Sequence, residues 1–260
     1  MSQNFDPNQN YYFFNKKDSI PVVFIHGVGL DHQMWDAQVN YLNEFSILTY
    51  DLLGHGKTPC NKDKLSLKDF SEQLLEILAH LEIKKINLIG FSLGSLIALD
   101  FSYRFQKKVE KLILIGTTYK RSDQERSLVL DRFNQAKLNK PISKQALKRW
   151  FSDKYLNDNP KTYDLFMNIL NKKPEDHKNF LKAYELFANH HDNFEAIKKI
   201  DRKTLVMTGS DDAGSTPAMS KKLVKDLVNS TYIEIQNGKH LCSIECVDDV
   251  NMNIKKFINN

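Results

Sequence analysis

The stretch Asn87–Ala98 reads NLIGFSLGSLIA. The apolar run Ile86–Ile89 is typical of a buried strand, and the longer pattern Leu93–Phe105 is typical of a helix. Ser92 lies at their junction with a glycine two residues away on either side, which gives the pattern G-x-S-x-G. A strand that turns at once into a helix predicts an α/β protein with a functional residue at the turn.

Ser92 is the candidate nucleophile. A serine hydroxyl is a weak nucleophile, so it needs a neighbouring base and room around it. A very tight turn lifts the hydroxyl above the sheet and strains the serine backbone, and it crowds positions 90 and 94, where glycine fits. The helix that begins at Leu93 directs free N–H groups to the same point, so the Leu93 amide is a candidate oxyanion donor. The alternative is a turn in which Ser92 only caps the helix.

Beyond this stretch, short apolar runs alternate with helical patterns. The expected strands are Pro21–Ile25, Ser46–Tyr50, Val109–Ile115, Thr204–Thr208 and Tyr232–Ile235, and the expected helices are Leu67–Leu81, Pro217–Val228 and Val247–Ile258. This alternation predicts a mostly parallel twisted sheet with helices on both faces. Chemistry in such sheets belongs at the carboxyl ends of the strands.

One region breaks the alternation. Residues 118–199 are helical in pattern, charged and rich in aromatic side chains, among them Trp150. We therefore expect residues 1–117 and 200–260 to form an α/β core and residues 118–199 to form a helical cap over the strand ends. An ordinary set of packing helices is the alternative.

The composition of the chain indicates which classes of partner it can bind. The chain has 260 residues, 41% of them hydrophobic, and a formal net charge of +5. Only 6 of the 37 basic residues are arginine, and the lysines are scattered. Because arginine supplies most bidentate contacts to bases and phosphates, we expect no nucleic-acid partner.

The cysteines and the apolar runs give the expected location. The three cysteines, Cys60, Cys242 and Cys246, fit free thiols in a reducing compartment. No secretory signal and no run of 18 apolar residues is present, so a cytoplasmic protein without membrane contact is expected. The sequence contains no Cys-x-x-Cys motif, and none of its carboxylate–histidine spacings suggests a metal site, so no metal site is expected.

A second oxyanion donor should come from another strand end. His26-Gly27-Val28-Gly29 follows the strand Pro21–Ile25, and its glycines let the backbone approach a ligand closely. The Val28 amide is the candidate donor. We expect His26 to hold this loop by hydrogen bonds and not to act as a base.

Four segments of the chain resemble the α/β-hydrolase superfamily. They are VVFIHGVGLDHQMW (22–35), YDLLGHGKT (50–58), LIGFSLGSLIAL (88–99), and TGSDDAGSTP (208–217) together with GKHL (238–241). The resemblance implies an eight-stranded, mostly parallel sheet. Only some 20 residues precede Pro21, so the first antiparallel strands are expected to be shortened to one around Tyr11–Phe14.

The resemblance also implies the partners of Ser92. The family order is nucleophile, acid, histidine, which places the acid at Asp212 with Asp211 as the competitor, and the histidine at His240. Lys239 replaces the small residue that the family often has before the histidine, and it puts a cation at the pocket rim. The residues expected to contact substrate are Gly27, Trp35, Phe91 and Trp150.

A serine at position 92 indicates acyl transfer to water without cofactor or metal. The family's branches that open epoxides or displace halide use an aspartate there. The expected function is a serine hydrolase that cleaves a small or medium carboxylic ester or lactone, with water and this small molecule as its partners. Alternatives are a carbon–carbon bond hydrolase, a thioesterase, a cofactor-free perhydrolase and a non-catalytic ligand sensor. Nothing in the sequence predicts an oligomeric state.

Overall fold

The computed structural model describes residues 4–138, 143–171 and 174–260. Within this part of the chain, seven strands form one sheet in the order β1-β3-β2-β4-β5-β6-β7. The strands are β1 (Tyr12–Asn15), β2 (Val22–Ile25), β3 (Ile47–Tyr50), β4 (Ile86–Phe91), β5 (Val109–Ile115), β6 (Lys203–Gly209) and β7 (Ser230–Ile235).

All neighbouring strands pair in parallel except β1, which is antiparallel to β3 with Tyr12 opposite Tyr50. The prediction of a mostly parallel sheet with one short antiparallel strand near residues 11–14 is confirmed. β4 runs two residues further than its apolar run, because Gly90 and Phe91 still pair with Leu114 and Ile115 of β5. The strand therefore ends directly at Ser92.

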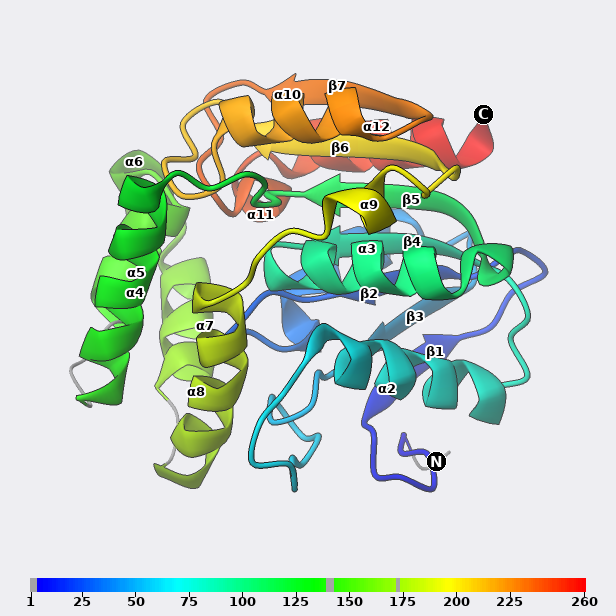
Figure 1. Cartoon of the computed structure of the whole chain (residues 1–260), viewed down its shortest axis with the longest axis horizontal. Coiled ribbons are helices and arrows are strands. Elements are labelled where there is room, and N and C mark those ends of the chain that lie inside the picture. The colour runs from blue at the N-terminus through cyan, green and yellow to red at the C-terminus, as the bar shows by residue number, and fades with distance from the viewer. Residues whose placement is uncertain (1–3, 139–142, 172–173) are drawn as a thin grey trace.

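Helices cover both faces of the sheet (Figure 1). One face carries α2 (Leu67–His80), α3 (Leu93–Arg104) and α10 (Pro217–Asp226), and the other carries η1 (His32–Trp35), α1 (Asp36–Tyr41), α11 (Cys242–Glu245) and α12 (Val247–Asn259). A short η2 (Gln106–Lys108) leads into β5.

Strand side chains alternate between two buried clusters. On β4, Leu88 packs with α2 and α3, whereas Ile89 packs with the cluster that contains Trp35 and Ile254. This is the period of two that a strand buried on both faces requires.

A helical insertion separates β5 from β6. It consists of α4 (Asp123–Lys137), α5 (Ser143–Trp150), α6 (Asp153–Asp158), α7 (Pro160–Leu170), α8 (Pro174–Ala188) and α9 (Phe194–Ile197). Residues 139–142 and 172–173 of the predicted cap range 118–199 lie outside the described residues. In Figure 1, α4–α8 stand beyond the carboxyl ends of the parallel strands.

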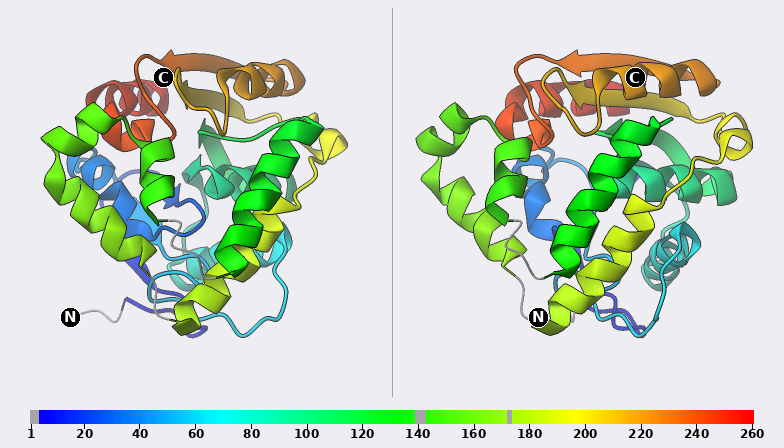
Figure 2. Two further views of the ribbon diagram at one scale, coloured as in Figure 1. Left: turned by 90° about the vertical axis from the view of Figure 1, so that its left-hand side faces the viewer. Right: turned by 60° about the vertical axis from the view of Figure 1, so that its left-hand side comes forward.

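The two views of Figure 2 show the insertion as two groups, with α4 beside α8 and α5 beside α7. Buried side chains of α5 and α7 belong to the hydrophobic cluster that contains Trp35. Buried side chains of α4 and α8 belong to the cluster on the other face of the sheet, with those of α2 and α3. Both groups are therefore fixed to the core of the sheet. None of the described helices combines the length and apolar character that crossing a bilayer requires.

Candidate active site

Ser92 occupies the turn between β4 and α3 in a strained conformation. Its backbone angles are φ 53° and ψ −114°, in a region that residues other than glycine rarely adopt. Its amide donates to the Ile115 carbonyl at 3.0 Å, and its side chain makes no capping hydrogen bond to α3. The alternative in which Ser92 only caps the helix is thus contradicted, and the hydroxyl remains available to the pocket.

The turn depends on close backbone approach at two glycines. A Cβ atom on Gly90 would lie 2.2 Å from the Gly94 carbonyl oxygen, and a Cβ atom on Gly94 would lie 2.3 Å from the carbonyl oxygen of Ile25 on β2. Real Cβ atoms do not approach backbone oxygens so closely. The two glycines therefore allow α3 to start against β2 and β4 at the required distance.

We expect Gly94→Ala to lower the free energy of unfolding by about 1–3 kcal/mol or more, because the added methyl group overlaps backbone that cannot move independently. A glycine-to-alanine change inside a helix ordinarily stabilises the helix, so the sign of the effect is diagnostic. Urea unfolding followed by circular dichroism measures it. Gly214→Ala is the matched control, because its nearest neighbour would be 3.5 Å away. A stability of Gly94→Ala equal to that of the wild type contradicts this account of the turn.

The loop after β2 and the start of α3 carry the two amides that the sequence predicts as oxyanion donors. Gly27 lies close enough that a Cβ atom there would be 3.4 Å from the Ser92 Cβ, so the loop after β2 reaches the serine. Leu30 N–H donates to the Gly27 carbonyl and Gly29 N–H donates to His55. Within the described residues, the Val28 and Leu93 amides between and beside them have no acceptor. Amides without an acceptor are a requirement for oxyanion donors.

His26 holds the loop that carries Val28. Its Nδ1 donates to the Gly27 carbonyl at 2.8 Å and its Nε2 accepts from the Leu52 amide at 3.0 Å. Burial lowers the pKa of His26, which agrees with a neutral ring whose two nitrogens have opposite roles. Both nitrogens are occupied, so this histidine is placed to fix the loop and not to accept a proton from Ser92.

Asp212 and His240 form a hydrogen-bonded pair after β6 and β7. His240 Nδ1 donates to Asp212 Oδ2 at 2.6 Å. The other carboxylate oxygen, Oδ1, accepts from the Gly214 and Ser215 amides at 2.8 and 2.9 Å. Asp212 is only 2% exposed, and these hydrogen bonds hold its carboxylate in one orientation. Asp211 is exposed and accepts from the Ser210 hydroxyl instead.

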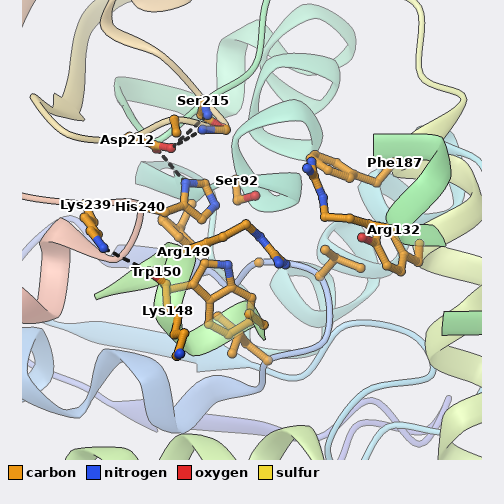
Figure 3. Close-up of a pocket in the computed structure, with 18 of the residues that line it drawn as sticks. Ser92, Arg132, Lys148, Arg149, Trp150, Phe187, Asp212, Ser215, Lys239 and His240 are labelled. Atoms are coloured by element: carbon orange, nitrogen blue, oxygen red, sulfur yellow. Dashed lines mark hydrogen bonds and ion pairs between the residues drawn. The ribbon is translucent and has the colours of Figure 1, made fainter. Parts of the chain in front are cut away.

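The imidazole of His240 lies beside Ser92 in the same pocket (Figure 3). Asp212 holds Nδ1, which leaves Nε2 as the ring nitrogen on the serine side, and the ring packs on Phe91 with centroids 4.8 Å apart. No hydrogen bond among the described residues joins the Ser92 hydroxyl to His240, and the hydroxyl points into the cavity. Rotation about the Cα–Cβ bond of Ser92 redirects the hydroxyl without moving the backbone.

A cavity of about 390 Å³ opens above Ser92. The core contributes Gly27, Val28 and Phe91, and Trp150 of α5 lines it as well. Most of its apolar wall comes from the helical insertion: Leu128, Ala146, Leu170, Phe180, Tyr184 and Phe187. The insertion and the sheet therefore share one cavity.

The structure places Trp35 elsewhere than on the cavity wall. Its side chain is fully buried between Phe24 and Phe91, with ring centroids at 5.0 and 6.5 Å. The large indole ring fills the core behind Phe91, and Phe91 is the residue that reaches the cavity. Trp35 therefore supports a wall residue and is not itself placed to contact a ligand.

Sequence reasoning missed two cavity residues, Arg132 of α4 and Arg149 of α5. A signal was present, because four of the six arginines lie in residues 118–199: Arg121, Arg126, Arg132 and Arg149. Arg121 and Arg126 do not line the cavity, so this concentration indicated the region of the chain and not the individual positions.

Metal ligands do not gather in the described part of the chain. There, no group of three or more histidine, cysteine, aspartate or glutamate residues is arranged so that it could hold a metal ion. The pair of His240 and Asp212 stands with Ser92 and two backbone amides. These groups can do acid–base and nucleophilic chemistry.

Similar proteins share this chain's fold over nearly its whole length. A family profile described as alpha/beta hydrolase fold matches residues 20–245. The chain is 26% identical over 257 residues to (E)-2-((N-methylformamido)methylene)succinate hydrolase of Acinetobacter baylyi, covering 96% of this chain and 95% of that protein. It is 22% identical to 3-oxoadipate enol-lactonase 2 of the same organism, covering 91% and 87%. The solved enol-lactonase from Burkholderia xenovorans LB400 has a TM-score of 0.88 at 22% identity, covering 96% of both chains.

Proposed function

We propose, from the premise that this chain belongs to the alpha/beta hydrolase fold family, that it is a serine hydrolase of small or medium carboxylic esters or lactones. Ser92 is the nucleophile, His240 the general base and acid, and Asp212 the residue that orients the imidazole. The observation that carries the proposal is the 2.6 Å bond between His240 and the buried Asp212, beside a strained serine in one cavity.

The first half of the reaction forms an acyl-enzyme. His240 Nε2 takes the hydroxyl proton of Ser92 while Oγ attacks the substrate carbonyl carbon. Asp212 accepts the hydrogen bond from Nδ1 and so favours the tautomer in which Nε2 is free to take a proton. The imidazolium then protonates the leaving alkoxide, and the carbon–oxygen bond breaks.

The second half hydrolyses the acyl-enzyme. Water gives a proton to His240 Nε2 and attacks the same carbonyl carbon, and the imidazolium returns the proton to Ser92 Oγ as the acid leaves. In both halves the carbonyl oxygen carries negative charge in the tetrahedral intermediate. In this proposal the Val28 and Leu93 amides, which have no acceptor among the described residues, bind that oxygen.

The size and wall of the cavity support a small or medium substrate. A volume of about 390 Å³ lies at the small end of ligand pockets, and the walls from α4, α7 and α8 are mostly apolar. The two similar curated proteins are named as a hydrolase and an enol-lactonase, and the second name supports hydrolysis of a lactone by this chain.

A fluorophosphonate probe tests the nucleophile directly. We expect covalent labelling of the wild-type protein at one residue, located by mass spectrometry in the peptide that contains Ser92, because a phosphonate reacts with an activated serine. Hydrolysis of p-nitrophenyl acetate is expected to be lost in step with labelling. Labelling at a different residue, or full hydrolysis after complete labelling, would overturn the assignment.

A further inference from the structure

Two arginines extend into the cavity from separate helices of the insertion. Arg132 comes from α4 and Arg149 from α5, and both side chains reach toward the space beside Ser92 (Figure 3). Both are partly buried. The two helices belong to the two different groups of the insertion, so the arginines approach the cavity from opposite sides.

Neither arginine has a carboxylate partner among the described residues. Arg132 makes no ion pair there, and Arg149 only donates from Nη1 to the Gln145 carbonyl at 3.0 Å. Outside the cavity, Arg104 pairs with Asp100 and Arg202 pairs with Asp201. Arg121 and Arg126 each donate to one backbone carbonyl, of Phe187 and His190, and Arg121 keeps Nε and Nη2 without a hydrogen-bond partner among the described residues. Arg132 and Arg149 thus keep guanidinium donors free at the cavity.

The two guanidinium groups also repel each other. Burial and the neighbouring charge of Arg132 lower the pKa of Arg149. Two partly buried cations near each other cost free energy unless an anion lies between them. An anionic group of a ligand relieves both the repulsion and the lost hydration.

Other charged side chains at the cavity do not fill this role. Lys239 Nζ donates to the Lys148 carbonyl at 2.9 Å and so points along the rim, and Lys148 itself is exposed. Asp211 is exposed and Asp212 is bound to His240. Within the described residues that line the cavity, no carboxylate neutralises the two arginines.

We propose that Arg132 and Arg149 together bind a carboxylate of the substrate, so that the enzyme selects esters or lactones that carry a second, free carboxylate group. The inference rests on the proposed function and specifies its substrate class. Guanidinium groups suit this task because they bind carboxylates through two parallel hydrogen bonds.

The walls define the rest of the substrate. The scissile carbonyl lies at Ser92 and the carboxylate lies at the two arginines. Apolar side chains, among them Leu128, line the same cavity, and Phe187 lies beside Arg132 (Figure 3). A substrate with a short chain of methylene groups between the scissile carbonyl carbon and the carboxylate carbon fits this arrangement. The arginines are positioning and specificity residues, and they take no part in the proton transfers.

Paired substrates test the proposal. The mono-p-nitrophenyl ester of glutaric acid carries the free carboxylate, and p-nitrophenyl pentanoate has a similar chain without it. We expect kcat/KM of the wild type to favour the glutarate ester, and this ratio to fall about 10- to 100-fold in Arg149→Gln, because a hydrogen-bonded charge pair is lost. Arg132→Gln is expected to lower the ratio in the same direction, mostly through KM.

Lys144→Gln is the matched control. Lys144 lies on the same helix as Arg149, is exposed and does not line the cavity, so the same loss of charge should leave the ratio unchanged. Thermal unfolding of each variant checks that it is folded. Equal ratios in the wild type and both arginine variants, with Ser92-dependent hydrolysis intact, would overturn this inference and leave the proposed function standing.

A binding measurement separates the two proposals. In the Ser92→Ala protein, which cannot turn over, glutarate is expected to bind in calorimetry and its neutral diamide is not. Adding Arg149→Gln should weaken glutarate binding by about 10-fold or more. Glutarate binding that is equal with and without Arg149, or equal for diacid and diamide, refutes the carboxylate site whatever the hydrolysis assays give.

Discussion

Ser92→Ala is expected to lower kcat/KM for p-nitrophenyl acetate by about 10⁴- to 10⁶-fold, the range seen when a serine nucleophile is removed from a triad. Alanine has no oxygen to attack the carbonyl, so no acyl-enzyme forms. The oxyanion donors and the imidazole remain, and they leave only a residual rate above that in water. Initial rates at several substrate concentrations, with purified enzyme in large excess for the variant, measure the loss.

The stability of this variant should hardly change. Ser92 is 4% exposed and its side chain makes no capping hydrogen bond. Alanine keeps the hydrogen bond that the backbone N–H of residue 92 donates to the Ile115 carbonyl. Ser127→Ala, on the exposed side of α4, is the control: it makes the same serine-to-alanine change away from the cavity and should keep the wild-type rate. A Ser92→Ala protein that is folded and keeps more than a tenth of the wild-type rate would show that another residue is the nucleophile.

Local patterns in the sequence were sufficient to predict the core of the fold. β2, β3 and β4 follow largely apolar runs and are buried along their whole length, as strands covered on both faces require. β7 lies at the edge of the sheet, and only Ile235 of this strand is buried. The turn at Ser92 was predictable as well, because the crowding that needs glycine is a property of a few adjacent residues. The positions of Asp212 and His240 came from family resemblance, since 28 positions along the chain, with one helix (α10) and one strand (β7) between them, separate the two residues.

The cavity walls were less predictable. An aromatic residue in a loop after a strand can face a ligand or the core, and nothing local in the sequence distinguishes these two environments for Trp35. The structure decides the matter through Phe24 and Phe91, which enclose the indole ring.

For helices too, the sequence does not show which residues face a cavity, as the arginines of the insertion illustrate. Arg132 precedes the buried Phe133, and Arg149 follows the buried Leu147 by two positions. Both therefore stand at the edge of an apolar face, where either solvent or a cavity can lie. Which of the two they face depends on how the helices of the insertion are placed over β4, and that placement is a matter of tertiary packing.

Asp212→Asn is expected to lower kcat/KM for the same ester by about 10³- to 10⁴-fold, with little change in KM. The asparagine carbonyl can keep the bonds from the Gly214 and Ser215 amides, which fixes its amide nitrogen toward His240. An amide nitrogen only donates, so His240 Nδ1 must accept and the ring proton moves to Nε2. The imidazole is then held with the wrong nitrogen protonated and cannot take the proton of Ser92.

Asp211→Asn is the matched control for this prediction, because the two carboxylates are adjacent in sequence but only one contacts the histidine. Asp211 is exposed and its hydrogen bond to Ser210 does not involve the ring, so its variant should keep its rate within about 3-fold, as surface changes usually do. Proton NMR of the imidazole ring reports the tautomer separately from the rate. A larger loss for Asp211→Asn than for Asp212→Asn would move the acid to Asp211, and equal small losses would mean that His240 acts without an orienting carboxylate.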